Sequence, residues 1–299
     1  MVDVIVIGTI GIDDIKTPFG DMKNLLGGSA VYASHAASFF AKAGMVSIAG
    51  EDLPVEHKEL LEKKGICLKG VEFKGKNFRW AGSYEFDMNE AKTLETGLNS
   101  LLDFDPKLPD EYRNAKYVLL GNIDPTLQLK VIEQLREPEL ILLDTMNFWI
   151  DTKKDDLMKV IKKVDVLLLN DGEARQLFDT VSLVKCGQQA LHLGPKYVII
   201  KKGEHGALLF SDGKHFNAPG YPLEVLKDPT GCGDSFAGGF IGYIAKTKDI
   251  SEPNLRKAII YGSTIASFNA EDFSLEKQKQ ISIDDSENRF KEFREFREF

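Results

Sequence analysis

Short runs of aliphatic and β-branched residues recur along the chain, and stretches with apolar residues at helical spacing lie between them. The apolar runs predict strands at Val4–Ile7, Val46–Ala49, Tyr117–Leu120, Leu140–Leu143, Val166–Leu169 and Tyr197–Lys201. The helical spacing predicts helices at Thr126–Leu135, Lys153–Val164 and Asp171–Phe178. Strands that are hydrophobic throughout and alternate with helices are typical of a buried, mostly parallel sheet. We therefore expect an α/β fold with helices on both faces of the sheet and ligands at the carboxyl ends of the strands.

Two segments interrupt this alternation. Gly11–Leu26 is a long polar connection after the first strand, and Leu68–Gly97 is rich in aromatic and alternating residues. Within the second segment, Gly70–Gly75 and Asn77–Phe86 predict two strands joined by a turn at Lys74–Lys76.

Composition and charge exclude several classes of protein. The net charge of −8, with no basic stripe, argues against nucleic-acid binding. Cys67, Cys186 and Cys232 are too few and too scattered for a disulfide framework or a zinc site. No apolar run reaches the length of a membrane span, and the chain enters its first strand without a signal-peptide pattern. We expect a cytoplasmic enzyme.

A glycine-rich segment, Asp228–Asp234, runs directly into an apolar stretch of small residues that predicts a helix. A backbone with so few Cβ atoms can turn its N–H groups outward at a helix start and bind an anion there. Asp234 falls in the first turn of that helix, beside the anion. A carboxylate in this place makes sense if it takes a proton from a hydroxyl that attacks a phosphoryl group.

This segment closely resembles the C-terminal signature of the ribokinase-like (pfkB) carbohydrate and nucleoside kinase family, Asp-Thr-x-Gly-Ala-Gly-Asp. The resemblance implies that Gly231, Cys232 and Gly233 form an anion hole and that Asp234 is the catalytic base. It also implies a ribokinase-like fold and an ATP- and Mg²⁺-dependent kinase. The acceptor would be a hydroxymethyl-type hydroxyl of a sugar or nucleoside.

The same resemblance assigns residues to the substrate. Asp13 stands where the family carries an Asp that accepts hydrogen bonds from two sugar hydroxyls. Gly27 and Gly28 match the family's di-glycine motif, where the backbone hinges and approaches the sugar. Tyr32 stands where the family often has an Asn that touches the substrate, and this departure argues against a ribokinase-type substrate.

Other substrate candidates follow from their place in the expected fold. Asn122 and Asp144–Asn147 each come after a predicted strand, where a ligand cleft is expected. Arg79 and Trp80 lie in the aromatic segment and are expected to stack on the substrate or hydrogen-bond it. An exposed strand pair is the alternative interpretation.

Candidate nucleotide and Mg²⁺ residues follow from the resemblance as well. Asn170 and Glu173 match the family's Asn-x-x-Glu, whose Glu organises water around Mg²⁺ and whose Asn lies near the phosphates. On its own this segment reads equally well as a helix cap. Gly203 and Gly206 match the nucleotide loop, commonly Thr-x-Gly-x-x-Gly, and Lys202 is interpreted as replacing its small polar residue.

Many relatives bind K⁺ beside the anion hole. Asp228 and Thr230 match the positions used there, and Ser267–Ser274 is the candidate loop for carbonyl ligands. An Asp at this place can also simply cap a turn, so K⁺ activation is a hypothesis.

The resemblance divides the chain into a main domain and a lid. Residues 1–10, 27–67 and 98–299 would form the main α/β domain, and 11–26 and 68–97 a small β-sheet lid over the substrate. Aromatic lid strands often also form dimers, so a homodimer through the lid is left open.

Two rival functions are kept. One is a thiol enzyme that uses Cys232, because a helix N-terminus favours a thiolate. The other is a non-catalytic sugar-binding regulator.

The C-terminal segment has a repeat of its own. Phe recurs at every third position of Arg289–Phe299, which predicts a terminal helix docked on the body of the protein.

Overall fold

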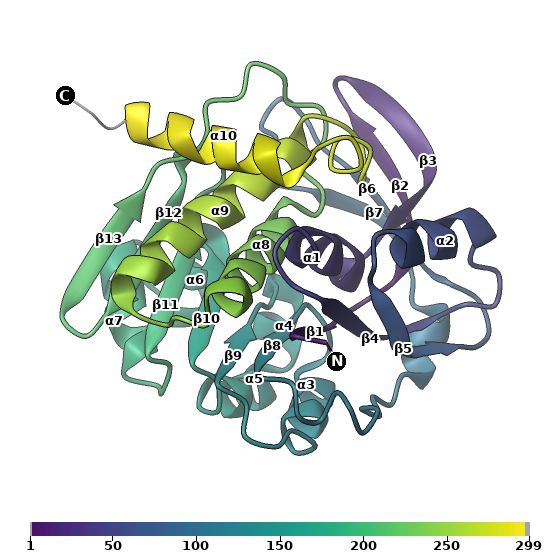
Figure 1. Ribbon diagram of the computed structural model, residues 1–299, viewed down its shortest axis with the longest axis horizontal. Coiled ribbons are helices and arrows are strands. Elements are labelled where there is room, and N and C mark those ends of the chain that lie inside the picture. Colours follow the sequence, from purple (N-terminus) through teal and green to yellow (C-terminus); the bar gives the residue numbers. More distant parts are fainter. Residues whose placement is uncertain (1, 297–299) are drawn as a thin grey trace.

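The computed structural model describes residues 2–296 and contains two sheets (Figure 1). The main sheet has nine strands in the order β13-β12-β11-β10-β9-β8-β1-β4-β5. Their bounds are β1 Val4–Ile7, β4 Ala43–Ala49, β5 Cys67–Phe73, β8 Tyr117–Leu120, β9 Leu140–Leu143, β10 Val166–Asn170, β11 Tyr197–Lys201, β12 Ala207–Ser211 and β13 Lys214–Ala218. In this order, the seven strands β11-β10-β9-β8-β1-β4-β5 pair in parallel. β12 and β13 extend the sheet beyond β11 as two antiparallel strands. The predicted α/β fold is confirmed.

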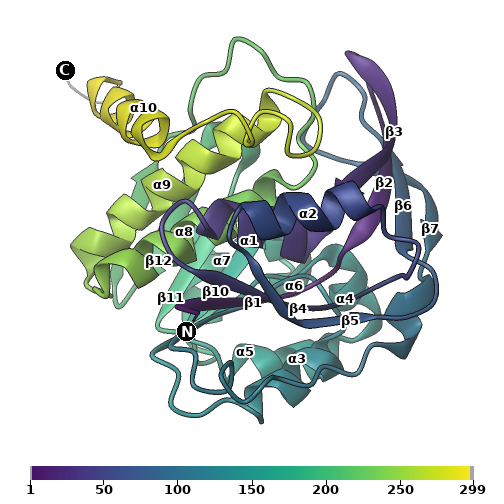
Figure 2. The same ribbon diagram turned by 45° about the vertical axis from the view of Figure 1, so that its right-hand side comes forward.

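Helices cover both faces of this sheet (Figure 2). Their bounds are α1 Ser29–Ala37, α2 Val55–Lys63, α3 Pro125–Ile132, α4 Asn147–Thr152, α5 Lys154–Ile161, α6 Asp171–Phe178, α7 Leu183–Leu191, α8 Cys232–Thr247, α9 Glu252–Ala270 and α10 Ile283–Glu295. Alternate residues of each central strand enter different cores, so Val4 and Val6 pack with α1, α8 and α9 while Ile5 and Ile7 pack with the opposite layer. Burial on both faces explains why the strands have no polar alternation.

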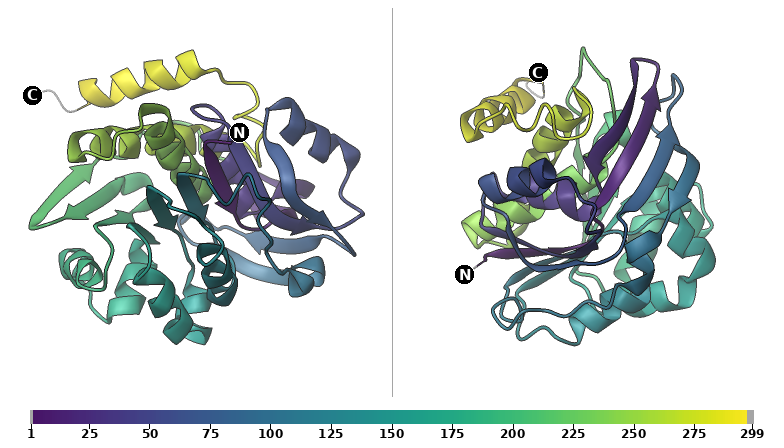
Figure 3. Two further views of the ribbon diagram at one scale, coloured as in Figure 1. Left: turned by 60° about the horizontal axis from the view of Figure 1, so that its bottom comes forward. Right: turned by 90° about the vertical axis from the view of Figure 1, so that its right-hand side faces the viewer.

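The small sheet has the order β3-β2-β6-β7, with bounds β2 Gly11–Thr17, β3 Gly20–Gly27, β6 Phe78–Ser83 and β7 Lys92–Gly97. It stands beside the helical layers in the right-hand view of Figure 3. The expected small sheet is confirmed, but the pairing of Gly70–Gly75 with Asn77–Phe86 is wrong. β5 pairs in parallel with β4 at the edge of the main sheet, so after β2 and β3 the chain returns to the small sheet only at β6.

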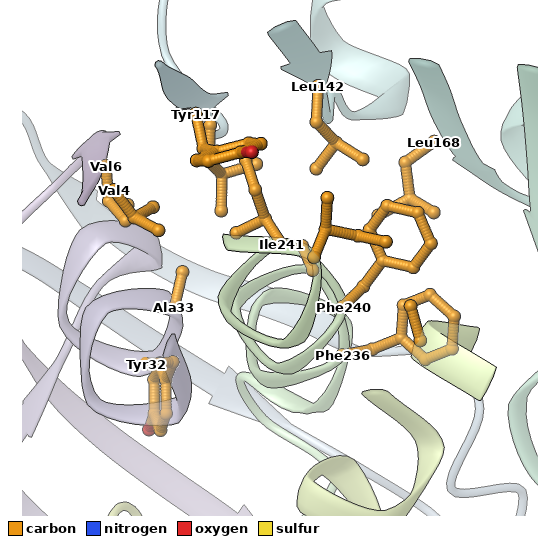
Figure 4. Packing of buried hydrophobic residues seen from close by; sticks show 14 of the residues in the cluster. Val4, Val6, Tyr32, Ala33, Tyr117, Leu142, Leu168, Phe236, Phe240 and Ile241 are labelled. Carbon is orange, nitrogen blue, oxygen red and sulfur yellow. The ribbon is translucent and has the colours of Figure 1, made fainter. Parts of the chain in front are cut away.

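Helix α8 lies between α1 and α9 with very close backbone contacts (Figure 4). A Cβ added to Gly238 would lie 2.1 Å from the carbonyl oxygen of Ala33 in α1. On the sheet side, Phe240 and Ile241 point toward Leu168 and Tyr117. The small residues after Asp234 therefore fix how deeply the start of α8 sits in the molecule.

The C-terminal helix α10 packs on α9, as its Phe repeat predicts. The ring of Phe290 stacks on Tyr261 with centroids 4.3 Å apart, and Phe293 is 2% exposed. Phe299, the last member of the repeat, lies outside the described residues. Across residues 2–296 the helices are all too short or too polar to cross a bilayer. The cytoplasmic location stays a prediction.

Candidate active site

Three adjacent parallel strands of the main sheet, β9, β10 and β11, end close to the start of α8. Asp144 directly follows β9, Asn170 ends β10, and Lys201 ends β11 in register with Asn170. Because parallel strands all end at the same edge, side chains distant in sequence converge there. This edge is the candidate active site.

The start of α8 presents free backbone donors. Gly231 is the N-cap and has a φ of 75°, a left-handed conformation that favours glycine. Within residues 2–296 the N–H groups of Gly231 and Gly233 make no hydrogen bond, whereas Cys232 N–H donates to the carbonyl of Pro229 at 3.1 Å. A helix start with unpaired N–H groups stabilises a bound anion. The free N–H groups of the two glycines therefore form the candidate anion site, whereas the N–H of Cys232 is already bonded.

Asp234 occupies the first turn of α8 and is half-buried. Burial raises the pKa of its carboxyl to about 7, the charge of Asp144 adds to this shift, and Lys201 opposes it. A carboxyl with a pKa near neutrality can accept a proton at physiological pH and release it again. Asp234 thus has the electrostatic setting of a general base.

A buried ion pair lies beside Asp234. The Lys201 ammonium is 2.9 Å and 3.1 Å from the two carboxylate oxygens of Asp144. Burial opposes the positive charge, but Asp144 and Glu173 outweigh it and raise the pKa of Lys201. Lys201 is therefore charged. It was not among the site residues predicted from the sequence.

The structure does not bring Lys202 to the start of α8, so its place at the nucleotide site stays a prediction. Its ammonium bonds to Asn217 of β13 at 3.1 Å, away from the start of α8. In the pattern Thr-x-Gly-x-x-Gly, Gly203 takes the third position, so Lys201 and not Lys202 stands at the polar one. Counting back from Gly203 was the signal available in the sequence.

The nucleotide loop itself needs its glycines. Gly203 and Gly206 have φ values of 54° and 83°, and a Cβ on Gly206 would lie 2.1 Å from the carbonyl oxygen of Ala218. A side chain at either position would be strained, and at Gly206 it would also clash.

Asn170 and Glu173 form a capping box at the start of α6. Asn170 N–H donates to Glu173 Oε2 and Glu173 N–H donates to Asn170 Oδ1, both at 2.7 Å. The helix-cap interpretation is therefore right for the amide oxygen of Asn170 and for one of the two carboxylate oxygens of Glu173. Glu173 is 7% exposed, and burial raises its pKa to about 7, with Lys201 lowering it and Asp144 raising it. The second carboxylate oxygen of Glu173 has no partner in the part of the chain that the structure describes.

Asp13 lies at the base of the small sheet, 4% exposed, against the di-glycine motif. A Cβ on Gly27 would lie 1.8 Å from Asp13 Oδ2, and Gly28 has a φ of 102° with the carbonyl of Thr9 beside it. Burial raises the pKa of Asp13 to about 8, and the nearby charges of Asp228 and Asp234 add to this rise. The two glycines thus make room for a carboxylate that lies close enough to Asp234 for its charge to act on Asp13.

Tyr32 packs beneath the anion site. It is 1% exposed, and a Cβ on Gly231 would lie 2.3 Å from its ring. Its hydroxyl is buried near the side chain of Ser274. The ring therefore supports the glycine-rich turn from below.

Comparison with known proteins decides the family. The family model described as pfkB family carbohydrate kinase matches residues 4–279, nearly the whole chain. The chain belongs to the pfkB family of carbohydrate kinases. The kinase is a phosphotransferase with an alcohol group as acceptor, and it phosphorylates a sugar or a nucleoside.

Its relatives include several nucleoside kinases. A cytidine kinase of Thermococcus kodakarensis is 30% identical over 84% of this chain and 92% of its own length. A nucleoside kinase of Methanothermobacter thermautotrophicus is 26% identical over 93% of this chain and 87% of its own. The solved Burkholderia thailandensis nucleoside kinase in complex with ADP-inosine has a TM-score of 0.80 at 18% identity, covering 97% of this chain and 95% of that one. This structural likeness shows the same fold.

The side chains of Asn122 and Arg79, two predicted substrate residues, are bonded to other side chains of the kinase. Asn122 accepts a hydrogen bond from the Trp149 indole at 2.8 Å and donates to the sulfur of Met146 at 3.0 Å. Arg79 donates to Asn24 at 2.8 Å and pairs with Asp14 at 3.5 Å.

Strand register separates Arg79 from the substrate side of the lid. In the small sheet Asp13 pairs with Trp80, and Ile12 pairs with Arg79. Directly paired residues project to the same face, and successive residues to opposite faces. Trp80 therefore shares the face of Asp13, whereas Arg79 lies on the other face. On this geometry Arg79 faces away from Asp13, and its contact with the substrate stays a prediction.

Asp228 is fully buried and caps the turn before α8. Its two oxygens accept hydrogen bonds from the N–H groups of Thr230 at 2.9 Å and Ser274 at 3.3 Å. Helix α9 continues to Ala270, so only the last residues of Ser267–Ser274 form a loop. Thr230 in turn donates its hydroxyl to Tyr84 of the lid at 3.2 Å.

The surroundings of Cys232 do not favour a reactive thiolate. Burial raises the pKa of the thiol to about 12, and the charges of Asp228 and Asp234 add to this shift. The Sγ atom donates to the carbonyl of Ala266 in α9 at 3.5 Å. The helix N-terminus does not compensate for burial between carboxylates. The thiol-enzyme alternative therefore has no support, and membership of a kinase family also argues against a non-catalytic regulator.

Proposed function

We propose that the kinase transfers the γ-phosphoryl group of ATP to a hydroxymethyl-type hydroxyl of a nucleoside, with Asp234 as the general base. The observation that carries this proposal is the position of Asp234. It is a partly buried carboxyl with a pKa near 7, one residue after the free N–H of Gly233. An acceptor hydroxyl at this point meets the base and the anion site at once.

The substrate class is inferred from the relatives and from the lid. Relatives that match most of the chain are named cytidine kinase and nucleoside kinase. Asp13 would accept hydrogen bonds from sugar hydroxyls. Trp80, on the same face of the lid as Asp13, offers a ring on which a nucleobase can stack.

Mg²⁺ and the nucleotide phosphates fit the residues at the ends of β10 and β11. Glu173 keeps one carboxylate oxygen free, and Asn170 keeps its amide N–H groups free, within residues 2–296. Mg²⁺ retains most of its waters in proteins, so a single carboxylate that holds those waters suffices. When bound, Mg²⁺ neutralises charge on the phosphate oxygens. Gly203 and Gly206 would allow the loop to approach the nucleotide.

The residues of the chain then divide the reaction among them. Asp234 takes the proton of the attacking hydroxyl, while the N–H groups of Gly231 and Gly233 stabilise charge on the transferring phosphoryl group. The lid excludes water, which would otherwise be phosphorylated in place of the substrate. The hydrogen bond between Thr230 and Tyr84 links the lid to the anion site.

A panel of nucleosides and sugars, assayed with ATP and Mg²⁺, tests the substrate class. We expect at least one nucleoside to give a higher kcat/KM than any free sugar. A free sugar as the best substrate would overturn the nucleoside assignment without affecting the family.

Two neighbouring substitutions in β6 test the role of the lid. Trp80→Leu is expected to raise KM for the nucleoside about tenfold or more, because stacking on a base contributes about 1–3 kcal/mol. Arg79→Ala, on the opposite face, is expected to change KM by less than about twofold, because an exposed ion pair contributes about 0–1 kcal/mol. Steady-state kinetics measure both values. Equal changes in the two variants would contradict this orientation of the lid.

Activation by K⁺ remains a hypothesis. The Asp228 carboxylate and the loop that begins after Ala270 lie together beside the anion site, which supports it. We expect higher turnover in KCl than in choline chloride at equal ionic strength. Identical rates in the two salts would remove the hypothesis and leave Asp228 as a turn cap.

Dimerisation through the lid and the exact boundaries of the lid also stay predictions.

A further inference from the structure

Asn269, in the last turn of α9, bonds to the turn that precedes α8. Its Nδ2 amide donates to the carbonyl of Thr230 at 2.7 Å. Thr230 N–H donates to Asp228 Oδ1 at 2.9 Å, and the carbonyl of Gly231 accepts from Ser235 N–H at 2.8 Å. Among the N–H and C=O groups of Thr230 and Gly231, the N–H of Gly231 alone has no partner within residues 2–296.

The hydrogen bond from Asn269 decides where the free N–H points. The Thr230 carbonyl and the Gly231 N–H belong to one planar trans peptide unit, so they point in opposite directions. Because Asn269 holds the carbonyl on the side of α9, the N–H is directed away from α9. A rotation of this peptide unit would turn the N–H out of the candidate anion site.

A chain of hydrogen bonds orients the Asn269 amide. Its Oδ1 accepts from Gln278 Nε2 at 2.8 Å, and Gln278 Oε1 lies 2.8 Å from His35 Nδ1. Burial lowers the pKa of His35 to about 3, so its ring is neutral. An amide oxygen only accepts, so His35 donates from Nδ1. The donors therefore run in one direction, from His35 through Gln278 and Asn269 to the carbonyl of Thr230.

The members of this chain are shielded from water. Asn269, Gln278 and Ser235 are 0% exposed, and His35 is 1% exposed. Ser235 Oγ joins them, because it accepts from Gln278 Nε2 at 2.8 Å and donates to Asn269 Oδ1 at 3.3 Å. A buried polar network is rigid when its groups are satisfied by one another. This rigidity reaches the Thr230–Gly231 peptide unit through Asn269.

We propose that Asn269 is a positioning residue of this kinase, whose amide holds the Thr230–Gly231 peptide unit so that the Gly231 N–H faces the transferring phosphoryl group. Gln278 orients the amide from the opposite side. Asn269 acts through the backbone, and preorganised donors of this kind cost no reorganisation during the reaction. The proposal rests on the proposed role of the Gly231 N–H, but it depends neither on Asp234 as the base nor on which acceptor is used.

Asn269→Leu tests this proposal, because it keeps a side chain of similar size and removes the donor to Thr230. We expect kcat to fall by about 10²-fold, since a misplacement of about 1 Å can cost that much. The KM for the best acceptor of the panel and the Kd for ADP should change by less than about threefold, because the Gly231 N–H acts mainly on the transferring group. Steady-state kinetics and calorimetry measure these values. A purely structural role would not separate kcat from KM in this way.

Ser235→Ala is the matched control. It leaves an N–H of Gln278 without an acceptor in the same network, but Asn269 still donates to Thr230. We expect its kcat to stay within about twofold of wild type, because the peptide unit keeps its orientation. Asn269→Ala removes the same donor without adding methyl groups to the core, and it replaces Asn269→Leu if that variant does not fold.

Kinetics are measured below the melting temperature of each variant, so that unfolding does not lower kcat. Wild-type kcat in the folded Asn269 variant, or an equal loss of kcat in Ser235→Ala, would overturn the proposal. Failure of the Asp234 assignment is distinguishable, because turnover that survives Asp234→Asn leaves the difference between the Asn269 and Ser235 variants intact.

Discussion

Replacing Asp234 with Asn is expected to lower turnover by about 10²–10⁴-fold, the usual contribution of a positioned general base. Asn keeps the size of the side chain but does not accept the proton of the attacking hydroxyl. Steady-state kinetics give kcat, and calorimetry with ADP shows that the nucleotide site is intact. Turnover within a few-fold of wild type would contradict the assignment of the base.

The same variant should fold at least as well as the wild type. Asp234 is charged in a half-buried site beside Asp144, and its raised pKa reflects that unfavourable setting. Removing the charge is therefore not expected to lower the melting temperature, and a large drop would show that lost activity reflects unfolding.

The pH dependence follows from the pKa of about 7. The base must be deprotonated to act, so kcat/KM for the acceptor should rise with pH through this value.

Replacing Gly238 with Ala is expected to lower the free energy of unfolding by about 2 kcal/mol or more. Its Cβ would lie 2.1 Å from the carbonyl oxygen of Ala33, and backbone of α1 cannot yield as a flexible side chain would. Overpacking costs about 1–3 kcal/mol and occasionally more, and a contact of 2.1 Å with backbone puts this site at the upper end or beyond. This cost competes with a gain of about 1 kcal/mol from replacing glycine within a helix. Because α8 carries Asp234 at its start, a displaced helix should also lower activity.

Gly239→Ala is the matched control for this prediction. Its Cβ would lie 3.1 Å from the Cα of Gly262, a contact that a small shift relieves. The gain in helix propensity then offsets most of the strain, and stability should stay within about 1 kcal/mol of wild type. Thermal and denaturant unfolding measure both variants. Equal stability of the two would show that α1 and α8 do not approach as closely as described.

The sequence by itself determined the strands at the centre of the main sheet. A strand buried on both faces needs an apolar side chain at every position, and Leu140–Leu143 or Val166–Leu169 reads as a strand without knowledge of its neighbours. The segment Asp228–Asp234 likewise predicted an anion site, because the left-handed conformation of Gly231 is a local backbone requirement.

Only the tertiary structure decided features that depend on which segments meet. The strand Cys67–Phe73 has a local pattern that suits either sheet, and its pairing with β4 assigned it to the main one. Lys201 and Lys202 are neighbouring lysines at the end of β11. Their side chains point in opposite directions, so Lys201 bonds to Asp144 and Lys202 bonds to Asn217. The pKa of Cys232 was set by burial and by carboxylates brought close in the fold. Burial and charge at a point are sums over the whole molecule, so a short stretch of sequence does not contain them.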